Sequence, residues 1–438
     1  MLGTAASICR CRTPLAASVR WKTQKFKTKI AKSRPVKTPS MLALDHFDFY
    51  YGPLFGKRWP SIRLGLVSPN KFIAIANRFS NSFETNQQIL TDIGSEDLIS
   101  KLTSGKKASE RIAEKKKRTE EKPLEADEYA EQGYEPPKEV MGLKETESRL
   151  DRLDIKVTGL EGQFANLPSK EDFIYYPREL KAFTFPRGSM ADFPFPSKDA
   201  DGVPGWWLLD GGSLVPVLAL DLQQGDTVLD MCAAPGGKSL LVLQTGLAKK
   251  LVCNDFKLAR LGQLQKALSM YVPENCEAAD RVILKRRDAT NLEAWDEECQ
   301  YDKVLVDVPC TTDRLAAQQD EGNLYSATMS NERLNLPQIQ TKILLNALRS
   351  VKVGGYVVYS TCALSPVQNE SVVENAVAIA SEKMGMEVIE KKLVQLERHL
   401  TSSGFYRFSE QCRRGSLVIP FLPSNFGPMY VCKLQRTK

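Results

Sequence analysis

The sequence predicts an α/β protein built on a doubly wound, Rossmann-like parallel sheet with an N-terminal extension. Short apolar segments that favour strands alternate with helix-like segments between residues 210 and 384, which is typical of such a sheet. The run DMCAAPGGKS at residues 230–239 lies between a predicted strand and a predicted helix. A strand, a Gly-rich turn and a helix N-terminus together predict a site for a nucleotide-type cofactor.

The elements of this domain follow in order along the chain. Predicted strands cover residues 227–231, 251–254, 282–285, 304–308 and 356–360, and predicted helices cover 239–246, 258–271, 336–350 and 368–384. Residues 415–419 and 429–434 predict two more strands, which we expect to pair antiparallel at the sheet edge. Residues 160–205 are rich in Phe and Pro, and Pro lacks the N–H that helices and sheets need. This stretch predicts an ordered, irregular segment that wraps the domain.

Composition divides the chain into four parts: a basic leader (1–40), a small helical extension (41–100), a charged linker (101–159) and a catalytic domain (160–438). The leader holds ten Lys or Arg and no acid, although the whole chain is only +7. An acid-free, Arg-rich leader predicts a mitochondrial transit peptide, and a basic arm that grips nucleic acid is the alternative. Residues 101–150 carry twelve basic and twelve acidic residues, too much charge for a buried core.

The bulk numbers restrict the class of protein. No apolar run reaches the roughly 18–20 residues that span a bilayer, so we expect no membrane association. Ten cysteines without a Cys-x-x-Cys pair and only two histidines argue against a zinc site, and we expect no metal. Beyond the leader the net charge is slightly negative, so RNA binding would need a local basic patch or a partner.

Polar and thiol side chains follow the predicted strands, where ligands of a doubly wound sheet bind. They are Asp255, Asp288, Asp307, Cys310 and Cys362. Four of them have a plainer interpretation: a helix cap for Asp255, a turn for Asp288, and a small buried hydrophobe for each cysteine. Two cysteines at adjacent positions of one crevice nevertheless favour a thiolate nucleophile.

The Gly-rich run has an alternative as well. Its end, GGKS at 236–239, is similar to a phosphate-cradling loop of a nucleotide hydrolase, but Cys232 stands where that motif needs Gly. Two thiols, a carboxylate and a nucleotide-like cofactor suit methylation at carbon 5 of a pyrimidine. A thiolate that adds to carbon 6 makes carbon 5 nucleophilic toward an activated methyl group. The base must first leave its stack.

These motifs resemble those of the NSUN (Nop/Sun) family of RNA cytosine-5 methyltransferases. The resemblance rests on DMCAAPGGK at 230–238, DVPCTT at 307–312 and STCALS at 360–365, and it covers about residues 160–438. The basic leader, FPRG at 185–188 and NFGPMY at 425–430 are most similar to the member that acts on mitochondrial ribosomal RNA. The resemblance implies an S-adenosylmethionine-dependent enzyme that methylates small-subunit ribosomal RNA in the mitochondrial matrix.

The resemblance also implies a role for each residue. Cys362 of the Thr-Cys motif would be the nucleophile, Cys310 of the Pro-Cys motif would assist product release, and Asp307 would face the methyl group and the cytosine. The cofactor would be held by a set of loop residues and by Asp307: Gly236, Gly237, Lys238, Asp255 on the ribose, Arg260 nearby, Asp288 near the adenine, and Ala289. Ala289 departs from the Gly expected there, although a backbone contact would survive the change.

A partner and a rival function complete the expectations. The resemblance implies a helical-repeat partner of the mitochondrial transcription termination factor family, which would supply RNA affinity and dock on residues 41–100 or 390–415. The enzyme would then take part in mitoribosome assembly. The rival is a non-catalytic assembly scaffold that keeps the methyltransferase fold. Intact Asp307, Cys310 and Cys362 favour the enzyme.

Overall fold

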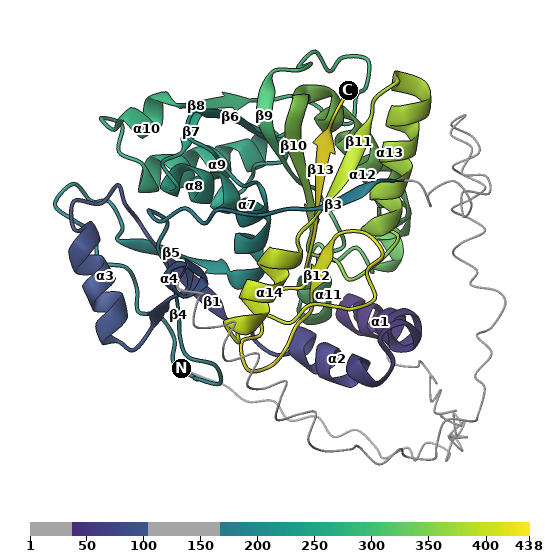
Figure 1. Ribbon diagram of the computed structural model, residues 1–438. Helices are drawn as coiled ribbons and strands as arrows, with labels where there is room; N and C mark the ends of the chain where they lie inside the picture. Colours follow the sequence, from purple (N-terminus) through teal and green to yellow (C-terminus); the bar gives the residue numbers. More distant parts are fainter. Residues whose placement is uncertain (1–36, 104–166) are drawn as a thin grey trace, which may run out of the picture. The chain divides into compact units, whose positions relative to one another are not determined.

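The structure is a computed structural model that describes residues 37–103 and 167–438 (Figure 1). Most of the predicted leader and of the predicted charged linker lies outside these residues. Residues Thr38–Lys438 form one compact unit.

The helices and strands of the described residues carry the labels of Figure 1. The helices are α1 (Pro39–Phe55), α2 (Trp59–Val67), α3 (Phe83–Asp92), α4 (Leu98–Thr103), α7 (Leu214–Ala219), α8 (Gly237–Gln244), α9 (Leu258–Tyr271), α10 (Glu277–Asp280), α11 (Asp313–Gln318), α12 (Ser330–Ser350), α13 (Glu370–Met384) and α14 (Val394–Ser402). The strands are β1 (Phe72–Ala76), β2 (Glu96–Asp97), β3 (Ser169–Glu171), β4 (Ala182–Thr184), β5 (Trp206–Asp210), β6 (Asp226–Asp230), β7 (Ala248–Asn254), β8 (Val282–Lys285), β9 (Tyr301–Asp307), β10 (Val351–Thr361), β11 (Val388–Lys392), β12 (Ser416–Val418) and β13 (Met429–Arg436).

A nine-stranded sheet with the order β3-β11-β13-β10-β9-β6-β7-β8, in which β12 pairs with β13, forms the centre of this unit. Strands β10, β9, β6, β7 and β8 are mutually parallel. The chain runs outward from β6 through β7 to β8 and then returns to β9 on the other side of β6, so the sheet is doubly wound as predicted. The order reverses between β6 and β9, and ligands of such sheets bind at this switch point.

Alternating residues of the strands fill two separate cores. On β10, Val358 belongs to the core beneath α7, α8 and α9, whereas its neighbours Val357 and Tyr359 belong to the core beneath α12 and α13. This alternation follows from the two-residue period of a strand. Both faces of the sheet are therefore covered by helices (Figure 1), which explains why the predicted strands are almost wholly apolar.

Each predicted strand of the parallel sheet overlaps an observed one, and the bounds of α9 and β8 are as predicted. Helix α12 begins six residues before the predicted start at 336. Pro337 favours the first turn of a helix, but in this structure it lies inside α12. No helix in the described ranges is long and apolar enough to cross a bilayer.

The prediction for the C-terminal strands was wrong in one respect. Strand β13 is antiparallel, as expected, but it lies between β10 and β11 rather than at the edge. Its side chains enter both cores, Val431 on one face and Tyr430 and Cys432 on the other. The sequence did not predict β11, which pairs with β13 on the side away from β10 and is followed at the sheet edge by β3.

The segment 41–100 contains strands as well as the expected helices. Strand β1 pairs with β4 and β5, and β2 pairs with β4, in a small antiparallel sheet. Strands β4 and β5 come from the Phe- and Pro-rich segment and its end. Helix α1 adds Phe47 and Tyr51 to the core beneath α12 and α13. The N-terminal segment therefore completes the same folded unit as the central sheet.

Candidate active site

Two cysteines meet at the carboxyl ends of β9 and β10. Cys310 follows β9, Cys362 follows β10, and their Sγ atoms lie 3.1 Å apart. The two strands are adjacent and parallel, so the loops that follow them leave the sheet side by side. The predicted juxtaposition of the two thiols is therefore present in the structure.

The surroundings of Cys362 favour its protonated thiol over the thiolate. The contact with Cys310 raises the pKa of Cys362 well above its usual range, and burial and the nearby Asp307 carboxylate raise it further. The Lys238 ammonium group acts in the opposite direction. The positive charge of Lys238 is therefore the influence among these that favours the thiolate of Cys362.

An ion pair lies beside the two thiols. Lys238 Nζ is 2.6 Å from Asp307 Oδ2, and the Ser360 hydroxyl donates to Asp307 Oδ1 at 2.9 Å. Burial opposes the charge on Lys238, but the Asp307 carboxylate outweighs it and raises the pKa of the ammonium group. Lys238 comes from the first turn of α8 and Asp307 from the end of β9. The pair thus spans the switch point of the sheet.

The Gly-rich loop turns from β6 into α8 as predicted. Gly236 adopts a φ of +115°, a conformation that favours glycine, and caps the helix that begins at Gly237. Ser239 donates a hydrogen bond to Asp230 Oδ2 at 2.6 Å, whereas Asp230 Oδ1 is buried without a partner among the described residues. Burial raises the pKa of Asp230 to about 7.

This raised pKa predicts how stability depends on pH. The pKa of Asp230 is about 3.9 in the unfolded chain, so the folded protein binds more protons between pH 4 and 7. Asp230 therefore lowers the free energy of unfolding as the pH rises through this window, by up to about 4 kcal/mol. We expect Asp230→Asn to be more stable than the wild type at pH 7.5, with a difference that disappears near pH 4. Urea denaturation of both proteins at several pH values measures this difference, and a constant difference would contradict the assignment.

The other predicted cofactor residues surround the same end of the sheet. Asp255 follows β7, and Arg260 in α9 lies with its Nε 3.7 Å from Asp255 Oδ2 while its guanidinium donates to Ala234 O. Asp288 follows β8, and its Oδ1 accepts hydrogen bonds from the backbone and the hydroxyl of Thr290. Ala289 is buried.

The arrangement fits a ligand with hydroxyl and amino groups. Asp255 is 4% exposed, and its Oδ2 lies in an ion pair with Arg260 but accepts no hydrogen bond within the described residues. A buried carboxylate oxygen without a donor is costly unless a partner satisfies it, and the hydroxyls of a ribose are suitable donors. Asp255 Oδ1 accepts from the backbone N–H of Lys257, so the carboxylate also holds the turn into α9.

Asn254, which the sequence places at the end of a strand that lines the crevice, joins three loops. Its side-chain amide donates to Met231 O at 3.0 Å and Arg287 O at 3.1 Å, and its carbonyl accepts from Arg287 N at 2.8 Å. These contacts hold the loops after β6, β7 and β8 in one arrangement. A buried Asn at the end of a predicted strand was the signal that could have identified this role.

Sequence reasoning missed Asp313, which ties both cysteine loops to α1. Its carboxylate accepts hydrogen bonds from the Tyr51 hydroxyl at 2.8 Å, the Thr311 hydroxyl at 2.5 Å and the Leu364 N–H at 2.8 Å. Thr311 follows Cys310, and Leu364 lies two residues after Cys362. The side chain of Asp313 is wholly buried. It therefore fixes the distance between the two loops.

Among residues 37–103 and 167–438, no group of three His, Cys, Asp or Glu side chains could hold a metal ion.

Comparison with known proteins identifies the family. Residues 217–435 match the family model of the 16S rRNA methyltransferases RsmB/F. The 5-cytosine rRNA methyltransferase nsun-4 of Caenorhabditis elegans is 52% identical over 95% of this chain and 96% of its own length. The 5-cytosine rRNA methyltransferase NSUN4 of Mus musculus is 36% identical over 99% of each chain. The crystal structure of PH0851 shares the fold, with a TM-score of 0.50 and 16% identity over 90% of this chain and 68% of that chain.

The full-length similarity and the matching domain decide between the alternatives raised by the sequence, a methyltransferase, a nucleotide hydrolase and a non-catalytic scaffold. The chain belongs to the NSUN family of RNA cytosine-5 methyltransferases, and S-adenosylmethionine is its methyl donor.

Proposed function

We propose that this enzyme methylates a cytosine of small-subunit ribosomal RNA in the mitochondrial matrix, with Cys362 as the nucleophile. The two thiols 3.1 Å apart beside the Lys238–Asp307 pair carry this proposal. The names of the relatives from C. elegans and mouse support ribosomal RNA as the substrate. The composition of the leader, basic and free of acids, supports import into mitochondria.

Cys362 forms the covalent bond in this mechanism. Its thiolate adds to carbon 6 of the cytosine, and the electrons of the 5,6 double bond make carbon 5 nucleophilic. The bound cofactor supplies the methyl group that carbon 5 takes up. The Lys238 ammonium favours the thiolate of Cys362, whose pKa the Cys310 contact, burial and Asp307 otherwise raise.

Asp307 positions the base. Its carboxylate is held between Lys238 and Ser360, with the side chain of Asp307 31% exposed toward solvent. A carboxylate in this place accepts a hydrogen bond from the exocyclic amino group of cytosine. This contact distinguishes cytosine from uracil, which has a carbonyl there, and keeps carbon 6 near Cys362.

Cys310 acts in product release. After methylation, carbon 5 loses its proton, the carbon 6–sulfur bond breaks, and the double bond forms again with Cys362 leaving as the thiolate. Cys310, in contact with Cys362 Sγ, takes up the carbon 5 proton as a thiolate and becomes a thiol. The reaction consumes no oxidant or reductant.

We assign the cofactor site to the loops that surround the ends of β6, β7 and β8. Gly236 and Gly237 allow close approach to the backbone of the turn into α8, Asp255 receives the ribose hydroxyls, and Arg260 holds the loop through Ala234 O. Asp288, Ala289, Lys238 and Asp307 complete the site.

A partner and an assembly role extend this proposal. Helices α1 and α2 expose large apolar side chains, among them Phe49 at 58% and Leu64 at 50%, which favour a protein partner on this surface. We assign it to the helical-repeat protein of the mitochondrial transcription termination factor family. Because the target base must leave its stack, methylation is easier before the small subunit is complete, which places it within mitoribosome assembly.

Covalent trapping tests the proposal. Wild type, Cys310→Ala and Cys362→Ala are incubated with mitochondrial ribosomal RNA, S-adenosylmethionine and the partner, and a denaturing gel is read for a protein–RNA adduct. We expect the adduct to accumulate in Cys310→Ala and to be absent in Cys362→Ala. The exposed Cys299 provides the control, since Cys299→Ala should behave as the wild type. The reverse pattern would exchange the two roles, and no adduct in any protein that still binds S-adenosylmethionine would contradict the mechanism.

A further inference from the structure

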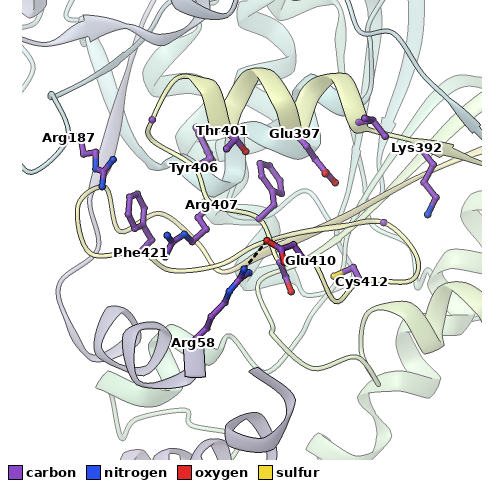
Figure 2. A pocket seen from close by; sticks show the side chains of 15 residues that line it. Arg58, Arg187, Lys392, Glu397, Thr401, Tyr406, Arg407, Glu410, Cys412 and Phe421 are labelled. Carbon is purple, nitrogen blue, oxygen red and sulfur yellow. Dashed lines mark hydrogen bonds and ion pairs between the residues drawn. The ribbon is translucent and has the colours of Figure 1, made fainter. Parts of the chain in front are cut away.

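A cavity of about 630 Å³ lies outside the active site, between α14, the segment 404–415, the loop at Phe421, Arg58 and Arg187 (Figure 2). Four of its lining side chains are cationic and two are carboxylates. Figure 2 shows Phe421 between Arg187 and Arg407. The guanidinium carbons of Arg187 and Arg407 lie 4.9 and 5.1 Å from the centre of the Phe421 ring.

The carboxylates of the cavity are already engaged. Glu410 pairs with Arg58 at 2.8 Å, and Glu397 accepts a hydrogen bond from Ser416. The cation Lys392 pairs with Glu390. Arg58, Lys392, Glu397 and Glu410 are therefore each engaged in an ion pair or a hydrogen bond within the described residues.

Arg187 and Arg407 have unused capacity for an anion. Both side chains are exposed, and neither guanidinium donates a hydrogen bond or lies in an ion pair within the described part of the chain. Each carries five N–H donors. The Glu410 carboxylate, which pairs with Arg58, also attracts Arg407, but it forms no direct hydrogen bond or ion pair with either guanidinium that stacks on Phe421. The outward N–H groups of Arg187 and Arg407 therefore suit an anionic ligand.

The cavity is connected to the catalytic loops by hydrogen bonds. Gly188 N donates to Pro423 O at 2.8 Å, which joins the turn of Arg187 to the loop of Phe421. Asn425, in the same loop, accepts two hydrogen bonds from the Arg314 guanidinium at 3.1 Å. Arg314 follows Asp313, the residue that holds the two cysteine loops. These hydrogen bonds link the segments that line the cavity to α11, the helix that follows the Cys310 loop.

We propose that Arg187 and Arg407 bind backbone phosphates of the substrate RNA that flank the target cytosine. Planar guanidinium groups suit phosphate oxygens and also stack on unpaired bases. An enzyme that takes a base out of its stack must hold the flanking backbone, and phosphate contacts set this register. The identity of RNA as the ligand rests on the proposed function, whereas the anion site rests on the geometry alone.

The test measures RNA binding as a function of salt. Arg187→Gln/Arg407→Gln is compared with wild type by fluorescence anisotropy, with a labelled 30-nucleotide single-stranded RNA of mixed sequence. Each phosphate contact on a single strand contributes about 0.7 to the slope of log K against log salt. We expect the slope to fall by about 1.4 and the affinity to fall about 25-fold at 0.1 M salt, with no difference near 1 M.

Two variants separate charge from folding. Lys249→Gln/Lys250→Gln removes two charges from exposed positions at the start of β7, the end of the sheet away from the cysteines, and should leave the slope unchanged. Arg187→Lys/Arg407→Lys keeps the charges and should retain most of the slope. Binding of S-adenosylmethionine, measured by calorimetry, should be equal in all four proteins.

Several outcomes would overturn the proposal. An unchanged slope in Arg187→Gln/Arg407→Gln would exclude phosphate contacts. Loss of binding to the helical-repeat protein with normal RNA binding would assign the cavity to a protein partner. Displacement of the RNA by an equal concentration of cytidine monophosphate would assign it to a free nucleotide. If the wild type binds RNA with the expected slope but methylates none, the proposed function fails while the phosphate site stands.

Discussion

Replacing Cys362 by serine is expected to lower the rate of methyl transfer by about 10⁴-fold or more, the usual scale for removal of a nucleophile. A serine hydroxyl is a far weaker acid than a thiol, so at neutral pH it supplies almost no anion to attack carbon 6. The change replaces one sulfur atom by a smaller oxygen on a half-buried side chain, so we expect the fold to be retained. The measurement is transfer of labelled methyl groups to RNA in a single turnover.

Cys310→Ser and Cys299→Ser are the comparison variants for Cys362→Ser. If Cys310 acts after methyl transfer, Cys310→Ser completes a first turnover and then stalls, so single-turnover transfer exceeds the steady-state rate. Cys299 is exposed and lies away from the active site, so Cys299→Ser should match the wild type. Normal turnover by Cys362→Ser would remove Cys362 from the role of nucleophile.

Replacing Asp313 by alanine is expected to lower the free energy of unfolding by about 3 kcal/mol. The substitution leaves three buried donors without an acceptor, the hydroxyls of Tyr51 and Thr311 and the N–H of Leu364, and each unsatisfied donor costs about 1–3 kcal/mol. Part of this loss is offset because the buried carboxyl group no longer has to be desolvated. Urea denaturation of the whole protein measures the change.

Two companion variants show whether the network is the cause. Tyr51→Phe removes one donor and leaves the carboxylate two others, so we expect a loss of about 1 kcal/mol. Asp320→Ala removes an exposed carboxylate that accepts from Ser40 N at 2.9 Å, and we expect a change below about 0.5 kcal/mol. Equal stabilities for Asp313→Ala and Asp320→Ala would mean that the three hydrogen bonds contribute nothing.

The parallel part of the fold was predictable because its strands are buried on both faces. Continuous apolar segments such as 304–308 have one interpretation when helices alternate with them. Strand β13 was predicted but misplaced, since its position between β10 and β11 depends on which strand edges the other strands leave unpaired. Strand β11 contains Glu390 and two lysines, and the pairings that bury Glu390 come from Lys392 and Arg414. Such long-range ion pairs leave no periodic signal.

The thiols and acids of the active site were predictable because a single rule, ligands at the carboxyl ends of strands, selects them. The residues that hold them in place were not. Asp313 lies 262 positions from Tyr51, and no local pattern links the two. Arg187 and Arg407 likewise meet on the Phe421 ring, in segments whose proximity depends on the folded arrangement.

The pairing of β1 with β4 and β5 and the contact of Tyr51 with Asp313 join segments on both sides of residues 104–166. The folded unit therefore depends on both described parts of the chain, residues 37–103 and residues 167–438. A polypeptide that begins at residue 167 would hold every predicted catalytic residue but would lack part of the folded unit. The Asp313 carboxylate, the strand edges and the apolar side chains that contact residues 38–103 would then be exposed.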